Sequence, residues 1–473
     1  MILLDRKSRR PLFEQIFRAL KKDIIEGWLK KNEALKPIRI LAEELQVSNN
    51  TINMAYRQLL AEGFIRSVRG SGYYVEDIEA VFGHLVKAKK ENPASVNSEK
   101  EKGLLYDFKY ESVEGGAFPW VKWRQYMQNA ILEESYVKLI EYECNKGNEY
   151  LRASICQYIN KSRGVNCTPD QIIICAGTQY AMDILTNVLP DKKYQVGVEE
   201  PGYNAMRQIF LNKGYQIKPI AITNKGIDLE ELEQSQCNLL YLTPSHQFPT
   251  GVTTSLSARK KILEWAKKRE GYVIENDYDN EFLYGQRSLP SIQALSGGEN
   301  VIYLSTLSKV LSPALRCAYL VLPPRLMRVY EDKYKYYYSA LPTCHQKALA
   351  QFIFDGQLEK HVRKVSSQNR KKYEIISGII EELLPNTVRI VEPSAGTHLL
   401  IELAGCINQN DMISRMKGQG IGIYGTKRYW FNKKHAPEKF FLLGYNSMEE
   451  EELEAAVRAF AAALEKVVTP KEL

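Results

Sequence analysis

Residues 301–323, VIYLSTLSKVLSPALRCAYLVLP, place one lysine between two apolar runs. The first run, residues 301–304, predicts a buried strand, and the second, residues 317–322, has the same character. Lys309 lies between them, where a buried ammonium group is costly unless it is paired or neutralised. A lysine that forms a Schiff base with a carbonyl compound uses such a position. An ordinary lysine in a surface turn is the alternative, and this stretch alone does not distinguish the two.

The chain around this stretch has the pattern of an α/β fold. From residue 106 onward, apolar runs that predict strands alternate with amphipathic helical patterns, which favours a mostly parallel sheet. Ligands of such sheets bind at the carboxyl ends of the strands. Polar residues directly follow each predicted strand, so we expect them to meet in one site. These strands cover residues 171–175, 195–198, 239–242, 272–274 and 301–304.

Two strand ends supply groups that suit a phosphate. Gly177, Thr178 and Gln179 open a predicted helix, whose first backbone amides attract anions. The segment that carries Lys309 adds hydroxyls and a guanidinium, from Thr306, Ser308 and Arg316. A capped turn without a ligand is the alternative for the glycine segment.

The other strand ends supply groups for an aromatic ring. Tyr203 follows a Pro-Gly pair and can lie flat over a ring, His246 belongs to the polar loop 243–251, and Tyr278 belongs to the cluster 275–279. A pyridoxal 5'-phosphate site needs a lysine, a phosphate cradle, a tyrosine donor and a partner for the pyridine nitrogen. The order of these groups along the chain predicts such a site, with Lys309 as the Schiff-base residue.

Composition excludes several other classes of protein. The chain has 473 residues, of which 44% are hydrophobic and 25% charged, so two or three globular domains are expected. No apolar run reaches membrane-spanning length and the first residues soon become charged, which predicts a cytoplasmic protein without a signal peptide. The eight cysteines form no C-x-x-C pair and the six histidines lack ligand spacing, so neither disulfides nor a metal site are expected. The net charge of +8 permits an anionic partner.

The first eighty residues predict a winged helix-turn-helix. Helical patterns cover residues 11–26, about 37–45 and 49–62, with Ser48 as the N-cap of the third helix. The polar start of that helix can reach base edges and phosphates. A strand, an arginine-bearing glycine turn and a second strand follow, at residues 64–68, 69–72 and 73–75. A small helical domain that binds protein is the alternative.

The run ILAEELQVSNNTINMAYRQLLAEGFIRSVRGSGYYV, residues 40–75, resembles the winged-helix domain of GntR-type bacterial regulators. The resemblance implies binding to a double-stranded DNA operator. It also implies five contact residues, Arg39, Asn49, Thr51, Arg66 and Arg69. The family pattern usually has an arginine where this chain has Asn49, so the operator sequence stays open.

Residues 106–467 resemble fold-type I aminotransferases, with a large α/β domain and a small C-terminal α/β domain. The motifs TPSHQFPTG, ENDYDNEF and STLSKVLSPALR behind a winged helix are similar to those of MocR-type (GabR-like) regulators. The resemblance implies pyridoxal phosphate bound at Lys309, a head-to-tail homodimer, and an effector that is a small amine, an amino-acid-like compound or the cofactor itself. We expect a DNA-binding domain at 1–80, a flexible linker at 81–105 and the cofactor-binding domain at 106–473.

Two departures from the family pattern bear on activity. Asn276 stands where the family usually has an aspartate, and it shares a strand face with Tyr278, while Asp277 faces the other way unless the strand twists. No arginine follows the strand 440–445 to hold a substrate carboxylate, and Arg207 and Arg428 are the candidate substitutes. We therefore expect a regulator with a degenerate aminotransferase domain and no catalytic residues. A working aminotransferase fused to a DNA-binding domain is the alternative.

Overall fold

The computed structural model describes residues 4–6, 11–68, 70–77, 103–110, 117–132, 141–189, 194–282, 289–391, 396–405 and 408–468. Two compact units divide the chain, Met1–Lys102 and Gly103–Leu473. The predicted linker, 81–105, lies almost entirely outside the described residues, which resume at residue 103.

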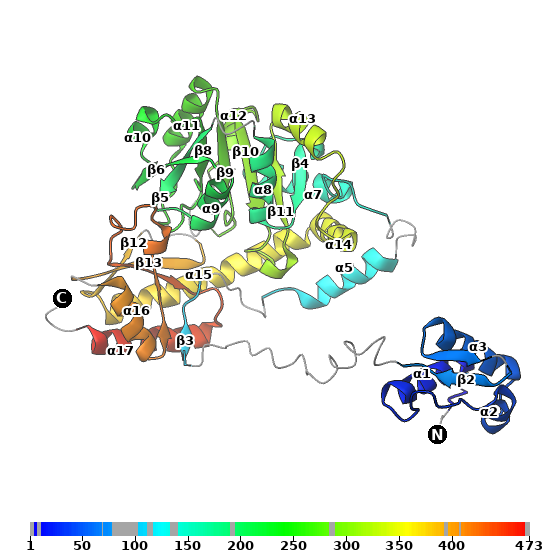
Figure 1. The fold of residues 1–473 in the computed structure, drawn as a ribbon. Coiled ribbons are helices and arrows are strands. Elements are labelled where there is room, and N and C mark those ends of the chain that lie inside the picture. The colour runs from blue at the N-terminus through cyan, green and yellow to red at the C-terminus, as the bar shows by residue number, and fades with distance from the viewer. Residues whose placement is uncertain are drawn as a thin grey trace. The chain divides into compact units, whose positions relative to one another are not determined.

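The described residues of the first unit form three helices followed by a β-hairpin, as the pattern predicted (Figure 1). Ser48 accepts a hydrogen bond from the Thr51 amide at 3.1 Å and caps the third helix. The second helix ends at Gln46, whose φ of 51° turns the chain sharply into that cap. The elements are α1 (Leu12–Ile25), α2 (Ile38–Leu45), α3 (Asn49–Ala61), β1 (Ile65–Val68) and β2 (Gly72–Val75).

The described strands of the second unit include an eight-stranded sheet. Its order is β4-β11-β10-β9-β8-β5-β6-β7, and the neighbours from β10 to β6 are all parallel. The sheet is therefore mostly parallel, as expected, with β11 and β7 as antiparallel members. The strands are β4 (Ile172–Cys175), β5 (Gln195–Glu200), β6 (Gln216–Thr223), β7 (Gly226–Ile227), β8 (Leu239–Leu242), β9 (Tyr272–Asn276), β10 (Val301–Thr306) and β11 (Ala318–Val321).

The lysine-bearing segment joins two antiparallel neighbours rather than a strand and a helix. Strand β10 pairs with β11 from Tyr303↔Val321 to Thr306↔Ala318, so residues 307–317 form the connection. Leu307 and Leu311 are buried in it, and the Val310 carbonyl lies 2.8 Å from His361 Nε2. These anchors fix the backbone on both sides of Lys309.

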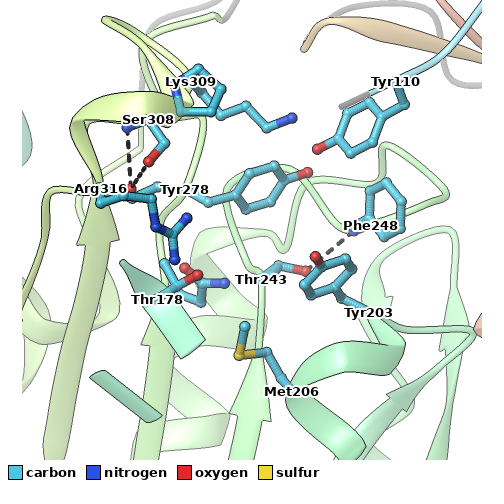
Figure 2. Close-up of a pocket in the computed structure, with 13 residues that line it drawn as sticks. Tyr110, Thr178, Tyr203, Met206, Thr243, Phe248, Tyr278, Ser308, Lys309 and Arg316 are labelled. Atoms are coloured by element: carbon cyan, nitrogen blue, oxygen red, sulfur yellow. Dashed lines mark hydrogen bonds between the residues drawn. The ribbon is translucent and has the colours of Figure 1, made fainter. Parts of the chain in front are cut away.

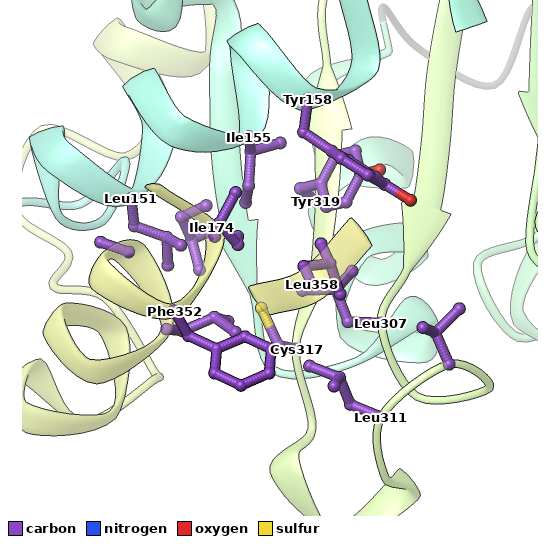
Figure 3. Packing of buried hydrophobic residues seen from close by; sticks show 14 of the residues in the cluster. Leu151, Ile155, Tyr158, Ile174, Leu307, Leu311, Cys317, Tyr319, Phe352 and Leu358 are labelled. Atoms are coloured by element: carbon purple, nitrogen blue, oxygen red, sulfur yellow. The ribbon is translucent and has the colours of Figure 1, made fainter. Parts of the chain in front are cut away.

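Helices cover both faces of this sheet, because strands buried on both sides need two apolar layers. On one face Leu151, Ile155, Ile174, Phe352 and Leu358 belong to one buried cluster (Figure 3). A second cluster, which includes Met182 and Phe210, covers the other face. The helices are α5 (Trp120–Leu132), α7 (Glu149–Arg163), α8 (Thr178–Val188), α9 (Asn204–Asn212), α10 (Leu229–Gln234), α11 (Leu256–Lys268), α12 (Ile292–Ser296), α13 (Pro324–Lys333), α14 (Thr343–Phe354) and α15 (Gln357–Leu383).

A smaller antiparallel sheet forms the C-terminal part of this unit, in the order β12-β13-β16-β15. The strands are β12 (Val388–Val391), β13 (His398–Leu403), β15 (Tyr424–Gly425) and β16 (Phe440–Gly444), with helices α16 (Gln409–Gly418) and α17 (Glu450–Val467). A separate parallel pair, β3 (Tyr106–Asp107) with β14 (Ile421–Gly422), ties the start of the unit to this part. None of the described helices combines the length and apolarity needed to cross a membrane.

Candidate cofactor site

A cavity of about 200 Å³ lies where the strands of the large sheet end. Each of five strands is followed directly by one or more of its lining residues, which is the arrangement that the sequence predicted. The close-up shows these side chains converging from separate segments (Figure 2). The lining residues are Tyr110, Thr178, Tyr203, Met206, Thr243, Phe248, Asn276, Tyr278, Thr306, Ser308, Lys309, Pro313 and Arg316.

Lys309 reaches into this cavity and points toward Tyr110. Its Nζ atom lies 3.8 Å from the centroid of the Tyr110 ring. Tyr110 is buried and was not predicted from the sequence, because nothing in its local pattern marks it. It arrives here through the pairing of β3 with β14, which joins residues more than 300 positions apart.

One end of the cavity is built to hold an anion. Gly177, with a φ of 94°, is the N-cap of α8, so backbone amides point out from the helix start. Arg316 lies directly over this glycine and donates from Nη2 to the Ala176 carbonyl at 3.3 Å. The hydroxyls of Thr306 and Ser308 lie 3.0 Å apart beside it. This combination of amides, a guanidinium and hydroxyls suits a phosphate.

Gly177→Ala should weaken anion binding at this end. A Cβ atom at residue 177 would lie 2.2 Å from Arg316 Nη2, so the guanidinium would have to move out of the cradle. The positive φ adds strain of about 1–3 kcal/mol, and together these effects should lower cofactor affinity at least ~10-fold. Fluorescence titration of the protein with pyridoxal phosphate measures this change.

The matched control is Gly356→Ala. Gly356 also has a positive φ, 68°, but its added Cβ would meet only Glu359 at 4.0 Å. Equal losses of affinity in the two variants would contradict the clash with Arg316.

The two candidate partners of a ring nitrogen point in different directions. Asn276 lines the cavity, and its Nδ2 atom donates to the Tyr241 hydroxyl at 2.7 Å. Its Oδ1 atom is buried without a hydrogen-bond partner among the described residues, so a ligand with a suitable donor would satisfy it. The strand continues regularly to Asn276, so no bulge brings Asp277 into the cavity.

Asp277 is held on the opposite side by a buried ion pair. Arg163 Nε donates to its Oδ2 atom at 2.6 Å, and the Tyr303 hydroxyl donates to the same oxygen at 2.8 Å. Burial disfavours the ionised carboxyl, but the Arg163 charge outweighs it and holds the pKa of Asp277 below its ordinary value. Asp277 therefore serves the interior rather than the cavity.

Three predicted residues, Gly177, Gln179 and His246, do not line the cavity, whereas Thr178 does. Gln179 is exposed on α8. His246 lies behind Tyr278, and its carbonyl accepts a hydrogen bond from the Tyr278 hydroxyl at 3.2 Å. The Nδ1 atom of His246 lies 2.6 Å from Asp279 Oδ2. His246 therefore supports Tyr278 from behind the cavity. Tyr203, Asn276, Tyr278 and the four residues of the lysine segment do line it.

Neither candidate substitute for the missing C-terminal arginine lines the cavity. Arg207 lies 3.7 Å from Glu200 and donates to the carbonyls of Tyr429 and Trp430 at 3.3 and 3.4 Å. Arg428 is exposed and donates to the Tyr429 hydroxyl at 2.5 Å. Arg207 therefore ties the large sheet's helix α9 to the small domain, whereas Arg428 contacts only its chain neighbour among the hydrogen bonds described.

The predicted DNA contacts in the first unit differ in their engagement. Arg39 and Asn49 are exposed, whereas Thr51 hydrogen-bonds to Ser48 as part of the helix cap. Arg66 is exposed but donates to Asn32 at 2.7 Å and lies 3.4 Å from Glu76. Arg69 lies outside the described residues.

Comparisons with known proteins agree with both halves of this description. Residues 113–460 match the model of aminotransferase class I and II, and residues 12–75 match that of bacterial regulatory proteins, gntR family. An uncharacterised HTH-type transcriptional regulator of Bacillus subtilis, YdeL, is 32% identical over 97% of this chain and 98% of its own length. The probable rhizopine catabolism regulatory protein MocR of Rhizobium meliloti is 29% identical over 98% and 96%.

The second unit is similar in fold to solved aminotransferase structures. The α-aminoadipate aminotransferase LysN of Thermus thermophilus, complexed with N-(5'-phosphopyridoxyl)-L-leucine, has a TM-score of 0.69 and 26% identity, and covers 82% of this chain and 98% of its own. The residues of the cavity fit pyridoxal phosphate, because they offer a lysine, an anion cradle blocked by any added Cβ and an unsatisfied amide oxygen. The chain belongs to the aminotransferase class I and II family, with pyridoxal phosphate as its cofactor, and carries a helix-turn-helix domain of the gntR family of bacterial regulatory proteins.

Proposed function

We propose that this protein is a DNA-binding transcription regulator that senses a small amine or amino-acid-like effector through pyridoxal phosphate bound at Lys309. The observation that carries the proposal is that an amide, Asn276, lines the cavity with its oxygen unsatisfied, in a chain that also has a helix-turn-helix domain. Regulators of full-length similarity support the same assignment.

The chemical reason concerns electron withdrawal by the cofactor ring. A carboxylate beside the pyridine nitrogen stabilises its protonated form, and the protonated ring accepts electrons from the substrate. An amide carries no charge and stabilises this form less, so carbon–hydrogen cleavage should be slow. Asp277 cannot take over, because Arg163 and Tyr303 hold it on the other side of β9. Lysine exchange with an amine needs no such electron withdrawal, which suits a sensor.

We also propose that the protein acts as a head-to-tail homodimer on DNA. Helix α5 exposes Trp120, Val121 and Leu132, and the neighbouring α14 exposes Phe354. Large apolar side chains grouped in this way are typical of a protein interface. The proposed dimer would present two helix-turn-helix units to an operator with two half-sites.

One experiment tests the regulator against the working aminotransferase. The purified holoprotein is mixed with DNA from upstream of its own coding region, and a panel of amines and amino acids is added with and without a keto acid. We expect a shift in the cofactor absorbance and a change in DNA affinity without repeated turnover. Sustained turnover with the keto acid would establish the enzyme instead, which the intact lysine and anion cradle also allow.

Asn276→Asp should restore part of the aminotransferase chemistry. The new carboxylate would face the ring nitrogen and should raise the rate of the half-reaction with an amino donor by about 100-fold, the size of one buried electrostatic contact. Stopped-flow absorbance measures this rate. Asn280→Asp is the matched control, because Asn280 is buried nearby but does not line the cavity. An unchanged rate in Asn276→Asp would show that another feature limits the reaction.

Arg39→Ala should weaken operator binding. Arg39 is exposed at the start of α2, and the loss of one phosphate contact should lower affinity several-fold and reduce the salt slope by about 1. Fluorescence anisotropy at several salt concentrations measures both quantities. Arg18→Ala removes the same charge from α1 and should have little effect, since Arg18 pairs with Glu14. If the two variants weaken binding equally, Arg39 contributes only to the net charge of the unit and makes no specific contact with DNA.

A further inference from the structure

The end of the cavity around Lys309 is aromatic. Besides Tyr110, whose ring lies 3.8 Å from Nζ, Phe248 and Tyr278 line this cavity. The Tyr110 ring packs against Phe248 at 5.0 Å and edge-on against His398 at 4.6 Å between centroids. Aromatic faces attract cations and apolar groups, and they repel anions.

The ionisable groups behind these rings also disfavour an anion. The Asp279 carboxyl is buried next to His246, and after burial it is the main cause that raises the pKa of both Tyr110 and Tyr278 well above the ordinary value. Burial, helped by the proximity of His246 and Lys309, holds the pKa of His398 well below its ordinary value, which disfavours the charged form of this imidazole. The ligand end is therefore backed by the Asp279 carboxyl, and burial disfavours a positive charge on His398.

No described guanidinium is available to a carboxylate at this end. Arg316 lies at the opposite, anion-binding end over Gly177, and it is the one arginine among the described lining residues. Neither Arg207 nor Arg428 lines the cavity: Arg207 donates to the Tyr429 carbonyl and Arg428 to the Tyr429 hydroxyl. Lys309 is the cation at this end, and its nitrogen is the atom that the proposed link to the cofactor uses. A carboxylate that finds no other cation there would lose its hydration without a compensating partner.

From this geometry we infer that the effector of the cavity is a primary amine without a carboxylate, with an apolar or aromatic body. The inference rests on the proposed function. It narrows the class of effector from amines and amino acids to amines without a carboxylate. The aromatic rings would bind the body of the amine, and the anion cradle would remain for the cofactor phosphate.

A matched pair of probes tests this inference on the full-length holoprotein. 2-Phenylethylamine and phenylalanine differ only in the carboxylate, and both enantiomers of phenylalanine are used. The cofactor content is first verified by absorbance, and the dissociation constants are then measured by isothermal titration calorimetry. We expect the amine to bind at least ~10-fold more tightly than either enantiomer, because the carboxylate has no buried partner. Equal or tighter binding of phenylalanine, or no binding of the amine, overturns the inference.

Asp279→Asn tests the electrostatic part separately. The amide keeps the size of the side chain and a polar partner for His246, but it removes the charge. The dissociation constant of phenylalanine divided by that of 2-phenylethylamine should fall several-fold in this variant. A purely structural role of Asp279 would not change this ratio. Asp170→Asn, which alters an exposed carboxyl beside Arg152, should leave the ratio unchanged. An unchanged ratio in Asp279→Asn would contradict the role of this charge.

A separate measurement of DNA affinity, with and without the amine, distinguishes failure of the ligand class from failure of the sensor proposal. If the amine binds but does not alter DNA affinity, the sensor proposal fails and the ligand class stands. If an amino acid binds more tightly and alters DNA affinity, the ligand class fails and the sensor proposal stands.

Discussion

Lys309→Ala is expected to abolish the visible absorbance band of protein-bound pyridoxal phosphate. The band depends on a covalent link between the lysine nitrogen and the cofactor aldehyde, and an alanine side chain cannot form it. The anion cradle at Gly177 and Arg316 would remain, so weak cofactor binding should persist until dialysis removes it. DNA binding without effector should persist, whereas its response to amines should disappear.

The fold of this variant should be intact. Lys309 is only half-buried, and its backbone is held by Leu307, Leu311 and the His361 contact to Val310. Thermal unfolding of the cofactor-free proteins should therefore change little. Lys213→Ala is the matched control, since Lys213 pairs with Asp183 outside the cavity and its loss should leave the band in place. A band that persists in Lys309→Ala would refute the assignment of this lysine.

Arg163→Met should destabilise the second unit by about 3–5 kcal/mol, which is the usual cost of leaving one partner of a buried ion pair alone. The Arg163 and Asp277 side chains are 2% and 0% exposed, and Arg163 also donates to Ser245 at 2.8 Å and to the Leu289 carbonyl at 2.9 Å. Without Arg163, the Asp277 carboxylate would be buried without its counter-charge. Urea unfolding followed by tryptophan fluorescence measures the loss.

A double variant separates the ion pair from the packing. Arg163→Met with Asp277→Leu removes both charges, so a large part of the lost stability should return. Arg415→Ala provides the contrast, because its pair with Asp411 is partly exposed and should contribute under ~1 kcal/mol. If Arg163→Met costs no more than Arg415→Ala, the ion pair does not secure the back of the site.

The sequence alone determined the elements and most of the cavity. Apolar runs located the strands because buried parallel strands leave little room for polar residues, and the residues after them had to meet at one edge of the sheet. Eight predicted residues line the cavity for this reason, among them Lys309, Asn276 and Arg316. Ser48 was predictable as a helix cap because capping is a local interaction.

Only the tertiary structure decided what depends on contacts between distant segments. The alternation of side chains along β9 did not decide whether Asn276 or Asp277 faces the cavity. The burial of Asp277 against Arg163, 114 residues away, shows that Asn276 does. Tyr110 and His398 come to the lysine from the small domain, and His246 lies behind Tyr278 rather than in the cavity. Local sequence patterns report which face of a strand or helix is buried, whereas the identity of the neighbour across that face depends on how the whole chain packs.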